Sequence, residues 1–173
     1  KTACKNLTRG TGYNVVGQLT VTQDPNEIVN VGGHLDSWDL AEGGNDDGSG
    51  VVQSIEVLRN IKANFIHPKR TVRAVAFANE EISGTGAEKY LEEVKLKNEQ
   101  QVFALESDEG GYAPRGFSLE MNEAQKDNIT KWKDLFYNSG IYFFEPGGSG
   151  SDVGPLRVLG TPLAGLSPDS QRY

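Results

Sequence analysis

Short runs rich in β-branched residues alternate with longer amphipathic runs along this chain, and this alternation is what most restricts its fold. The segments 71–78 (TVRAVAFA) and 101–106 (QVFALE) are short and largely apolar, which is typical of central strands covered on both faces. Residues 84–97, between them, have the pattern of a helix. Strands that alternate with helices predict an α/β fold with a mainly parallel sheet.

The remaining segments extend this pattern. The first two expected strands, 13–22 and 27–33, are separated by the turn residues 23–26 (QDPN), so we expect an antiparallel hairpin at the start of the sheet. Residues 48–65 carry apolar side chains three and four positions apart, which predicts a helix that ends before Pro68. The other expected elements are strands at 115–120, 141–144 and 161–166, and helices at 122–139 and 151–159.

The composition restricts the partners of this chain. Its 173 residues include 24 Asp and Glu against 17 Lys and Arg, a net charge of −7 without any basic run, so nucleic acid is not an expected partner. No apolar run is long enough to span a bilayer, and we expect no membrane insertion. Only two residues are histidines, the commonest metal ligand and general base, which limits the chemistry that the chain can carry.

Acidic side chains gather where the predicted strands end, and one histidine accompanies them. Ligands of open α/β sheets bind at the carboxyl edge of the strands, so these residues are expected to meet in one crevice. They are His34 and Asp36 after the second strand, Asp46 and Asp47 before the first long helix, Glu80 and Glu81 after the strand 71–78, and Asp108 after the strand 101–106.

Such a crevice needs a cation. Carboxylates about 4 Å apart repel one another by about 4 kcal/mol per pair at an effective dielectric near 20. One His with several carboxylates matches the ligands of zinc or a similar divalent ion, and two such ions would share a bridging carboxylate, which the Asp46–Asp47 segment could supply.

Two of these motifs suggest different roles for neighbouring side chains. In the pair Glu80–Glu81, one carboxylate can bind metal while its neighbour takes a proton from water. In the His-x-Asp motif, Asp36 can accept the second ring N–H of His34 and so orient the imidazole. Each motif alone has a structural explanation, such as a solvated turn or a helix N-cap. Their shared position at strand ends favours a site.

Three segments resemble the co-catalytic zinc exopeptidases related to bacterial leucyl aminopeptidases, and within that family the carboxypeptidase Q-like (plasma glutamate carboxypeptidase) branch. They are 32–50 (GGHLDSWDLAEGGNDDGSG), 68–81 (PKRTVRAVAFANEE) and 104–117 (ALESDEGGYAPRGF). The resemblance runs from Tyr13 to the end of the chain. It implies a three-layer α/β fold of the zinc-exopeptidase type, with a central mixed, mainly parallel sheet flanked by helices.

The resemblance also implies a metal site. His34, Asp46 and Asp108 would bind one zinc ion, and Asp46 would bridge to a second ion that Glu81 also holds. Glu80 would be the general base. Asp36, the other catalytic residue implied, would orient the metal-binding histidine.

The family uses a second histidine ligand, which would lie beyond Tyr173. The other histidine of this chain, His67, comes before a central strand, at the opposite end of the sheet. We therefore expect residues 1–173 to form a single metallopeptidase catalytic domain, truncated at its C-terminus, in which one of two zinc positions lacks a His ligand.

The predicted function is that of a zinc-dependent exopeptidase of the aminopeptidase or dipeptidase type, which hydrolyses a peptide bond with metal-activated water and Glu80 as base. The alternatives are a non-catalytic peptidase-like binding module, an inactive truncated fragment, and, as a third reading, glutaminyl cyclase chemistry on the same fold. Small peptides are the expected substrates. The resemblance implies a secreted or periplasmic protein and leaves a homodimer open.

Overall fold

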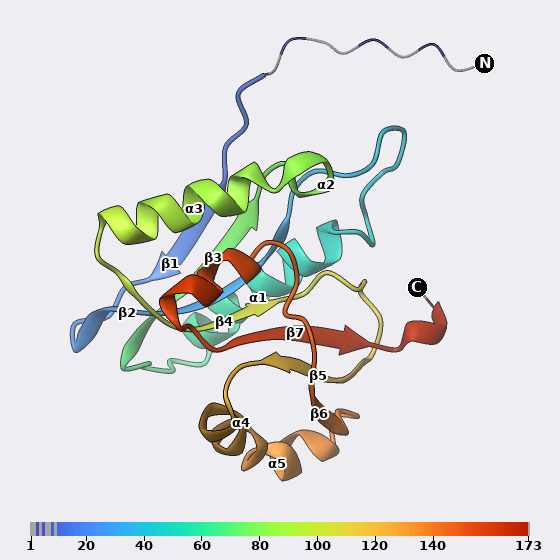
Figure 1. Cartoon of the computed structure of the whole chain (residues 1–173). Helices are drawn as coiled ribbons and strands as arrows, with labels where there is room; N and C mark the ends of the chain where they lie inside the picture. The colour runs from blue at the N-terminus through green and yellow to red at the C-terminus, as the bar shows by residue number, and fades with distance from the viewer. Residues whose placement is uncertain (1–2, 4, 6–7, 9, 173) are drawn as a thin grey trace.

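The computed structural model describes residues 3, 5, 8 and 10–172, which form one seven-stranded mixed sheet with helices on both faces (Figure 1). This confirms the α/β class. With 3-10 helices labelled η, the elements in chain order are β1 (Val15–Leu19), β2 (Asp24–His34), α1 (Gly48–Ala63), β3 (Arg70–Phe77), α2 (Glu80–Ser83), α3 (Thr85–Leu96), β4 (Gln100–Glu106), β5 (Pro114–Glu120), α4 (Glu123–Thr130), α5 (Lys133–Tyr137), β6 (Phe143–Pro146), η1 (Gly154–Leu159), β7 (Leu163–Pro168) and η2 (Ser170–Arg172).

The middle of the sheet is parallel. The strand order is β1-β3-β2-β4-β7-β5-β6; β2 pairs in parallel with both β3 and β4, and β4 pairs in parallel with β7. β1 is antiparallel to β3, whereas β5 is antiparallel to β7 and parallel to β6. The parallel strands β2, β3 and β4 therefore end at the same edge of the sheet, where ligands of α/β proteins bind.

The expected hairpin between residues 13–22 and 27–33 is wrong. β1 pairs with β3, with Val15 opposite Ala76, and not with β2. Both edges of β2 are occupied by parallel neighbours, so β1 takes the exposed outer edge of β3 instead. The chain bends at Thr22 and Gln23, and residues 24–26, expected in the turn, already belong to β2. A turn signal also carries no information about which strand becomes the partner.

Two predicted helices also differ. The segment 122–139 forms two short helices, because Trp132 donates its N–H to Ile129 three residues back, which tightens the chain between α4 and α5. The segment 151–159 forms only the 3-10 helix η1. Pro155 in its first turn lacks an N–H, and Gly160 ends it in the left-handed conformation.

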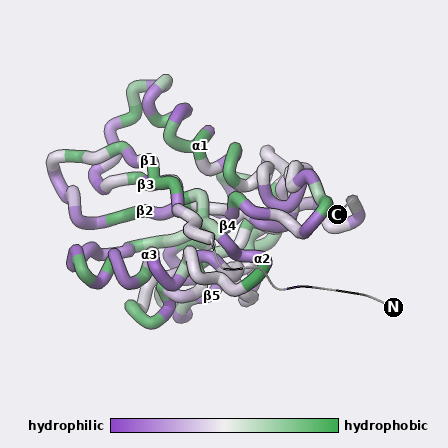
Figure 2. The backbone as a smooth tube through the Cα atoms, turned by 90° about the horizontal axis from the view of Figure 1, so that it is seen from above, coloured by the Kyte–Doolittle hydropathy of each residue, from purple (hydrophilic) through white to green (hydrophobic). Residues whose placement is uncertain are grey.

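The core lies on both faces of the sheet. On one face, α3 and η1 pack on β3, β4 and β7 around Phe77, whose ring meets Tyr90 edge to face at 5.5 Å. On the other, α4 and α5 cover a second cluster around Phe144. Figure 2 shows hydrophobic and hydrophilic stretches along α3, as expected of a helix with one face on the sheet. Among the described residues, no helix is long and apolar enough to cross a membrane.

Candidate metal centre

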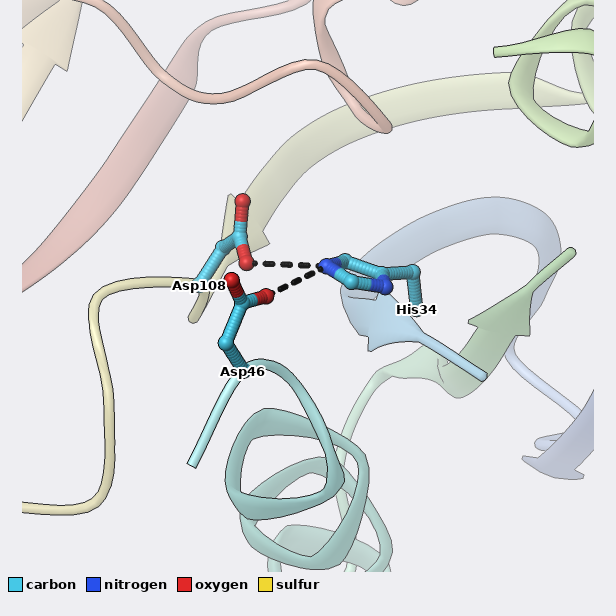
Figure 3. Close-up of side chains that lie close together, drawn as sticks. All are labelled: His34, Asp46 and Asp108. Carbon is cyan, nitrogen blue, oxygen red and sulfur yellow. Dashed lines mark hydrogen bonds and ion pairs between the residues drawn. The ribbon is translucent and has the colours of Figure 1, made fainter. Parts of the chain in front are cut away.

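Three separate parts of the chain bring a histidine and two aspartates together at the carboxyl edge of the sheet. His34 is the last residue of β2, Asp108 follows β4 by two residues, and Asp46 lies in the loop that leads into α1. In Figure 3 the two carboxylates converge on the same ring nitrogen of the histidine. The sequence analysis expected these three residues to meet, and the structure places them together.

The distances fit a common ligand. His34 Nε2 lies 3.1 Å from Asp46 Oδ1 and 3.1 Å from Asp108 Oδ1. One potential ligand atom from each of the three residues lies within 4.8 Å of the other two. One imidazole with carboxylates is a donor set that suits zinc, and three protein ligands leave a position for water or substrate. The His34 ring is buried whereas the two aspartates are partly exposed, so a cation held here faces solvent on one side.

The close approach of α1 to the sheet creates this arrangement. A Cβ at Gly50 would lie 1.8 Å from the carbonyl oxygen of Ser107, so only glycine lets the first turn of α1 pack against the segment that leads to Asp108. Asp47 is the N-cap of α1 and is buried. Its carboxylate accepts the backbone N–H groups of Gly50 and His34, each at 2.9 Å.

Asp46 and Asp47 therefore differ in position although they are adjacent, and the peptide bond between them is cis. The first contributes its carboxylate to the cluster, and the second joins the start of α1 to the end of β2. The residue pattern alone left open which of the two serves the site, and the resemblance assigned this role to Asp46; the hydrogen bonds of Asp47 are internal.

The second ring nitrogen of His34 fixes the orientation of the imidazole. Nδ1 lies 2.9 Å from the backbone carbonyl oxygen of Asp36, which can only accept, so Nδ1 carries the proton. Nε2 is thereby the atom that can bind a metal ion. The Asp36 carboxylate lies 3.8 Å from Nδ1. The expected orienting contact comes from Asp36, but its hydrogen bond is made by the backbone carbonyl and not by the side chain.

The Asp36 side chain has another contact. It accepts the backbone N–H of Glu80 at 3.0 Å and that of Glu81 at 3.2 Å, and so holds the start of α2 next to the end of β2. Asn79, just before α2, adopts the left-handed conformation that turns the chain into this helix. The two glutamates are thus positioned through their backbone, which leaves their carboxylates available to the site.

These two carboxylates occupy different environments. Glu80 Oε2 lies 3.9 Å from His34 Nε2. Glu81 has one carboxylate oxygen, Oε1, that is buried without a hydrogen-bond partner among the described residues. Burial, and then the negative charge of Asp46, raise the pKa of Glu81. A buried carboxylate oxygen without a partner favours a cation as its ligand.

Several carboxylates surround the single imidazole of the cluster. Burial acts to lower the pKa of His34, but the hydrogen bond and charge of Asp108 raise it to about 10. Burial raises the pKa of Asp47 to about 7, against the hydrogen bond from the His34 N–H. A group of carboxylates that holds a proton on an imidazole so strongly is also a strong electrostatic site for a divalent cation.

The other histidine lies elsewhere. His67 is exposed in the loop before β3, at the end of the sheet opposite His34. Sequence reasoning missed two buried acidic residues near the cluster, Glu106 and Asp152. The available signal for Glu106 was a charged residue ending an otherwise apolar central strand.

The chain is similar in sequence to known peptidases. The sequence pattern of peptidase family M28 matches residues 14–173. Carboxypeptidase Q of Homo sapiens is 34% identical over 161 residues, which are 93% of this chain and 34% of that protein. Carboxypeptidase Q of Mus musculus is 32% identical over 161 residues, with the same coverage. The chain thus spans about a third of the length of these relatives.

Solved structures share the fold. A peptidase M28 precursor from Shewanella amazonensis SB2B superposes with a TM-score of 0.82 at 29% identity, over 92% of this chain and 36% of that chain. A zinc aminopeptidase from Bacillus subtilis superposes with a TM-score of 0.68 at 23% identity, over 88% of this chain and 39% of that chain; at this identity the likeness concerns the fold alone.

Proposed function

This chain belongs to peptidase family M28, and on this basis we propose that it is the catalytic part of a zinc-dependent exopeptidase of the aminopeptidase or dipeptidase type. The observation that carries the proposal is the group of His34, Asp46 and Asp108, whose potential ligand atoms lie within 4.8 Å of one another at the carboxyl edge of the sheet. Small peptides are the proposed substrates.

The proposed ligands of the first zinc ion are these three residues. Asp46 also faces Glu81, whose pKa it raises, and these two carboxylates are the proposed ligands of a second ion. The residues present fit such ions, since Nε2 of the histidine is oriented as a ligand and a carboxylate oxygen of Glu81 is buried without a partner among the described residues. When bound, zinc supplies a Lewis acid that polarises the peptide carbonyl and makes water more acidic.

Glu80 is the proposed general base. Its backbone is held by the Asp36 carboxylate, and its side chain stands 3.9 Å from His34 Nε2, at the margin of the metal-binding group. From this position its carboxylate accepts a proton from the attacking water and then donates it to the leaving amine. Proton transfer of this kind contributes about 10²- to 10⁴-fold to a rate.

Asp36 is the proposed positioning residue. It fixes His34 through its carbonyl oxygen and the two glutamates through its carboxylate. One residue therefore sets the relative placement of the metal-binding imidazole and the base.

A secreted or periplasmic location, and assembly as a homodimer, remain predictions from the resemblance.

Two matched variants test the roles of the paired glutamates. Glu80→Gln is expected to keep zinc binding and to lower dipeptide hydrolysis at least about 100-fold, because only the proton acceptor is removed. Glu81→Gln is expected to weaken zinc binding. Loss of zinc from Glu80→Gln, with zinc retained in Glu81→Gln, would reverse the assignment.

The 173-residue chain and a version extended past Tyr173 should be assayed side by side, each with its zinc content measured. Zinc binding with hydrolysis in either version supports the peptidase. Zinc binding without hydrolysis of any dipeptide in the extended version favours a peptidase-like binding module. Absence of zinc from both versions contradicts the proposal.

A further inference from the structure

Two buried carboxylates lie next to the proposed metal ligands and have no part in the mechanism above. Glu106 is the last residue of β4, and Asp152 comes just before η1; both are 1% exposed. Carboxyl groups are seldom buried to this extent unless they are paired with a cation or carry a proton.

Glu106 connects the loop before η1 to the strand that leads to Asp108. Its Oε2 accepts the backbone N–H of Asp152 at 2.8 Å and that of Val153 at 2.7 Å. Gly150 has a φ of +109°, and a Cβ there would lie 2.1 Å from the Glu106 carboxylate, so the loop can come this close only with glycine. The position of Asp152 is therefore fixed relative to the metal-binding strand.

No hydrogen bond within the described part of the chain compensates for the burial of the Asp152 carboxylate. Both of its carboxylate oxygens are buried, and neither has a hydrogen-bond partner within the described part of the chain. Burial, and then the charge of Glu106, raise the pKa of Asp152 to about 9, with further effects from His34, Glu80 and Asp108. Asp152 thus lies within electrostatic range of the metal-binding group without belonging to the three residues that form it.

No nearby arginine supplies the missing charge within the described interactions. Arg157, on η1, donates to Glu120 at 2.6 and 3.2 Å. The Asp152 carboxylate therefore either holds a proton or is offset by a cation bound close by. Replacing Asp152 by a neutral residue should therefore affect the metal-bound protein, where a cation offsets its charge, more than the metal-free protein, where it holds a proton.

We propose that Asp152 is a positioning residue of the metal centre, held by Glu106, whose negative charge strengthens zinc binding by His34, Asp46 and Asp108 without coordinating the ion. The inference rests on the zinc site of the proposed function. In the metal-free protein the Asp152 carboxyl lies buried among other carboxyl groups without a hydrogen-bond partner in the described part of the chain, and a bound zinc ion supplies the positive charge that favours its ionised form. Residues behind a ligand set that act in this way commonly change metal affinity about 10- to 100-fold.

The test compares Asp152→Asn with Asp127→Asn, which makes the same chemical change at an exposed position of α4. Zinc affinity is measured by calorimetry, and thermal unfolding is followed with and without zinc. We expect Asp152→Asn to weaken zinc binding about 10- to 100-fold while its metal-free melting temperature stays the same or rises. Asp127→Asn should change neither quantity.

Three results would overturn the inference. They are zinc affinity in Asp152→Asn within twofold of the parent, a fall in metal-free stability that parallels the fall in affinity, and altered visible absorption of the Co²⁺ form, which would make Asp152 a direct ligand. If Asp152→Asn does not fold, Asp152→Ser replaces it. His34→Ala is titrated with zinc alongside. If the parent chain itself binds no zinc, the proposed function fails. If His34→Ala loses zinc and Asp152→Asn does not, only this inference is refuted.

Discussion

Replacing Glu99 by Gln removes the negative partner of a buried arginine. Arg73 on β3 donates to both carboxylate oxygens of Glu99, at 2.6 and 2.8 Å, and to the Tyr90 hydroxyl at 3.0 Å. The side chains of the ion pair are only 8% and 13% exposed. Breaking a buried pair by removing one partner costs about 3–5 kcal/mol. Because Gln keeps one acceptor oxygen, the expected loss in the free energy of unfolding is about 2–3 kcal/mol.

The assay is urea unfolding followed by circular dichroism at neutral pH. The double variant Arg73→Met with Glu99→Leu removes both charges and should recover most of the loss, since no buried charge is left without a partner. A loss below about 0.5 kcal/mol in Glu99→Gln, or a double variant less stable than the single one, would refute the reasoning.

The same pair predicts a pH dependence. The hydrogen bonds from Arg73 hold the pKa of Glu99 below its ordinary value. A carboxyl whose pKa is depressed in the folded state stabilises the fold above the unfolded pKa, and this contribution is lost as the pH falls through the folded pKa. The difference in stability between the parent and Glu99→Gln should therefore be constant near neutral pH and shrink below about pH 4. A difference that grows in acid would contradict this sign.

Two further substitutions test the packing that positions the site. Gly50→Ala would place a Cβ 1.8 Å from the Ser107 carbonyl oxygen and should lower both stability and zinc affinity, whereas Gly44→Ala, whose Cβ would meet nothing within 4 Å, should leave both unchanged. Phe77→Ala, at a fully buried position between α3 and the sheet, should reduce the free energy of unfolding by about 3–5 kcal/mol in the same urea assay. Equal effects of the two glycine substitutions, or a Phe77 variant as stable as the parent, would count against these contacts.

The sequence predicted the central strands well because their signal is local. β3 is a nearly unbroken apolar run, and such a run forms a strand buried on both faces wherever it lies in the sheet. The partner of β1 was not predictable in this way. Strand pairing depends on which sheet edges the rest of the fold leaves open, and β2 had none left for β1.

The same distinction holds for the site. His34, Asp46 and Asp108 were predictable because each stands at or near the end of a strand or the start of a helix, where the topology brings them to one edge. Asp36 was predicted as the residue that orients His34, but the use of its carbonyl for this contact and of its carboxylate for α2 depends on backbone geometry. Asp152 lies in a glycine-rich segment, and nothing in that local sequence indicates that its side chain is buried.

Zinc titration of His34→Ala beside His67→Ala tests whether His34 is the histidine of the proposed zinc site. The two variants make the same change at the two histidines of the chain, one at the cluster and one in the exposed loop before β3. His67→Ala should bind zinc as the parent does. His34→Ala, folded by circular dichroism, should bind it at least about 100-fold more weakly, because loss of a direct ligand exceeds the effect of an outer residue. Equal zinc affinity in the two variants would contradict a role of His34 as a zinc ligand.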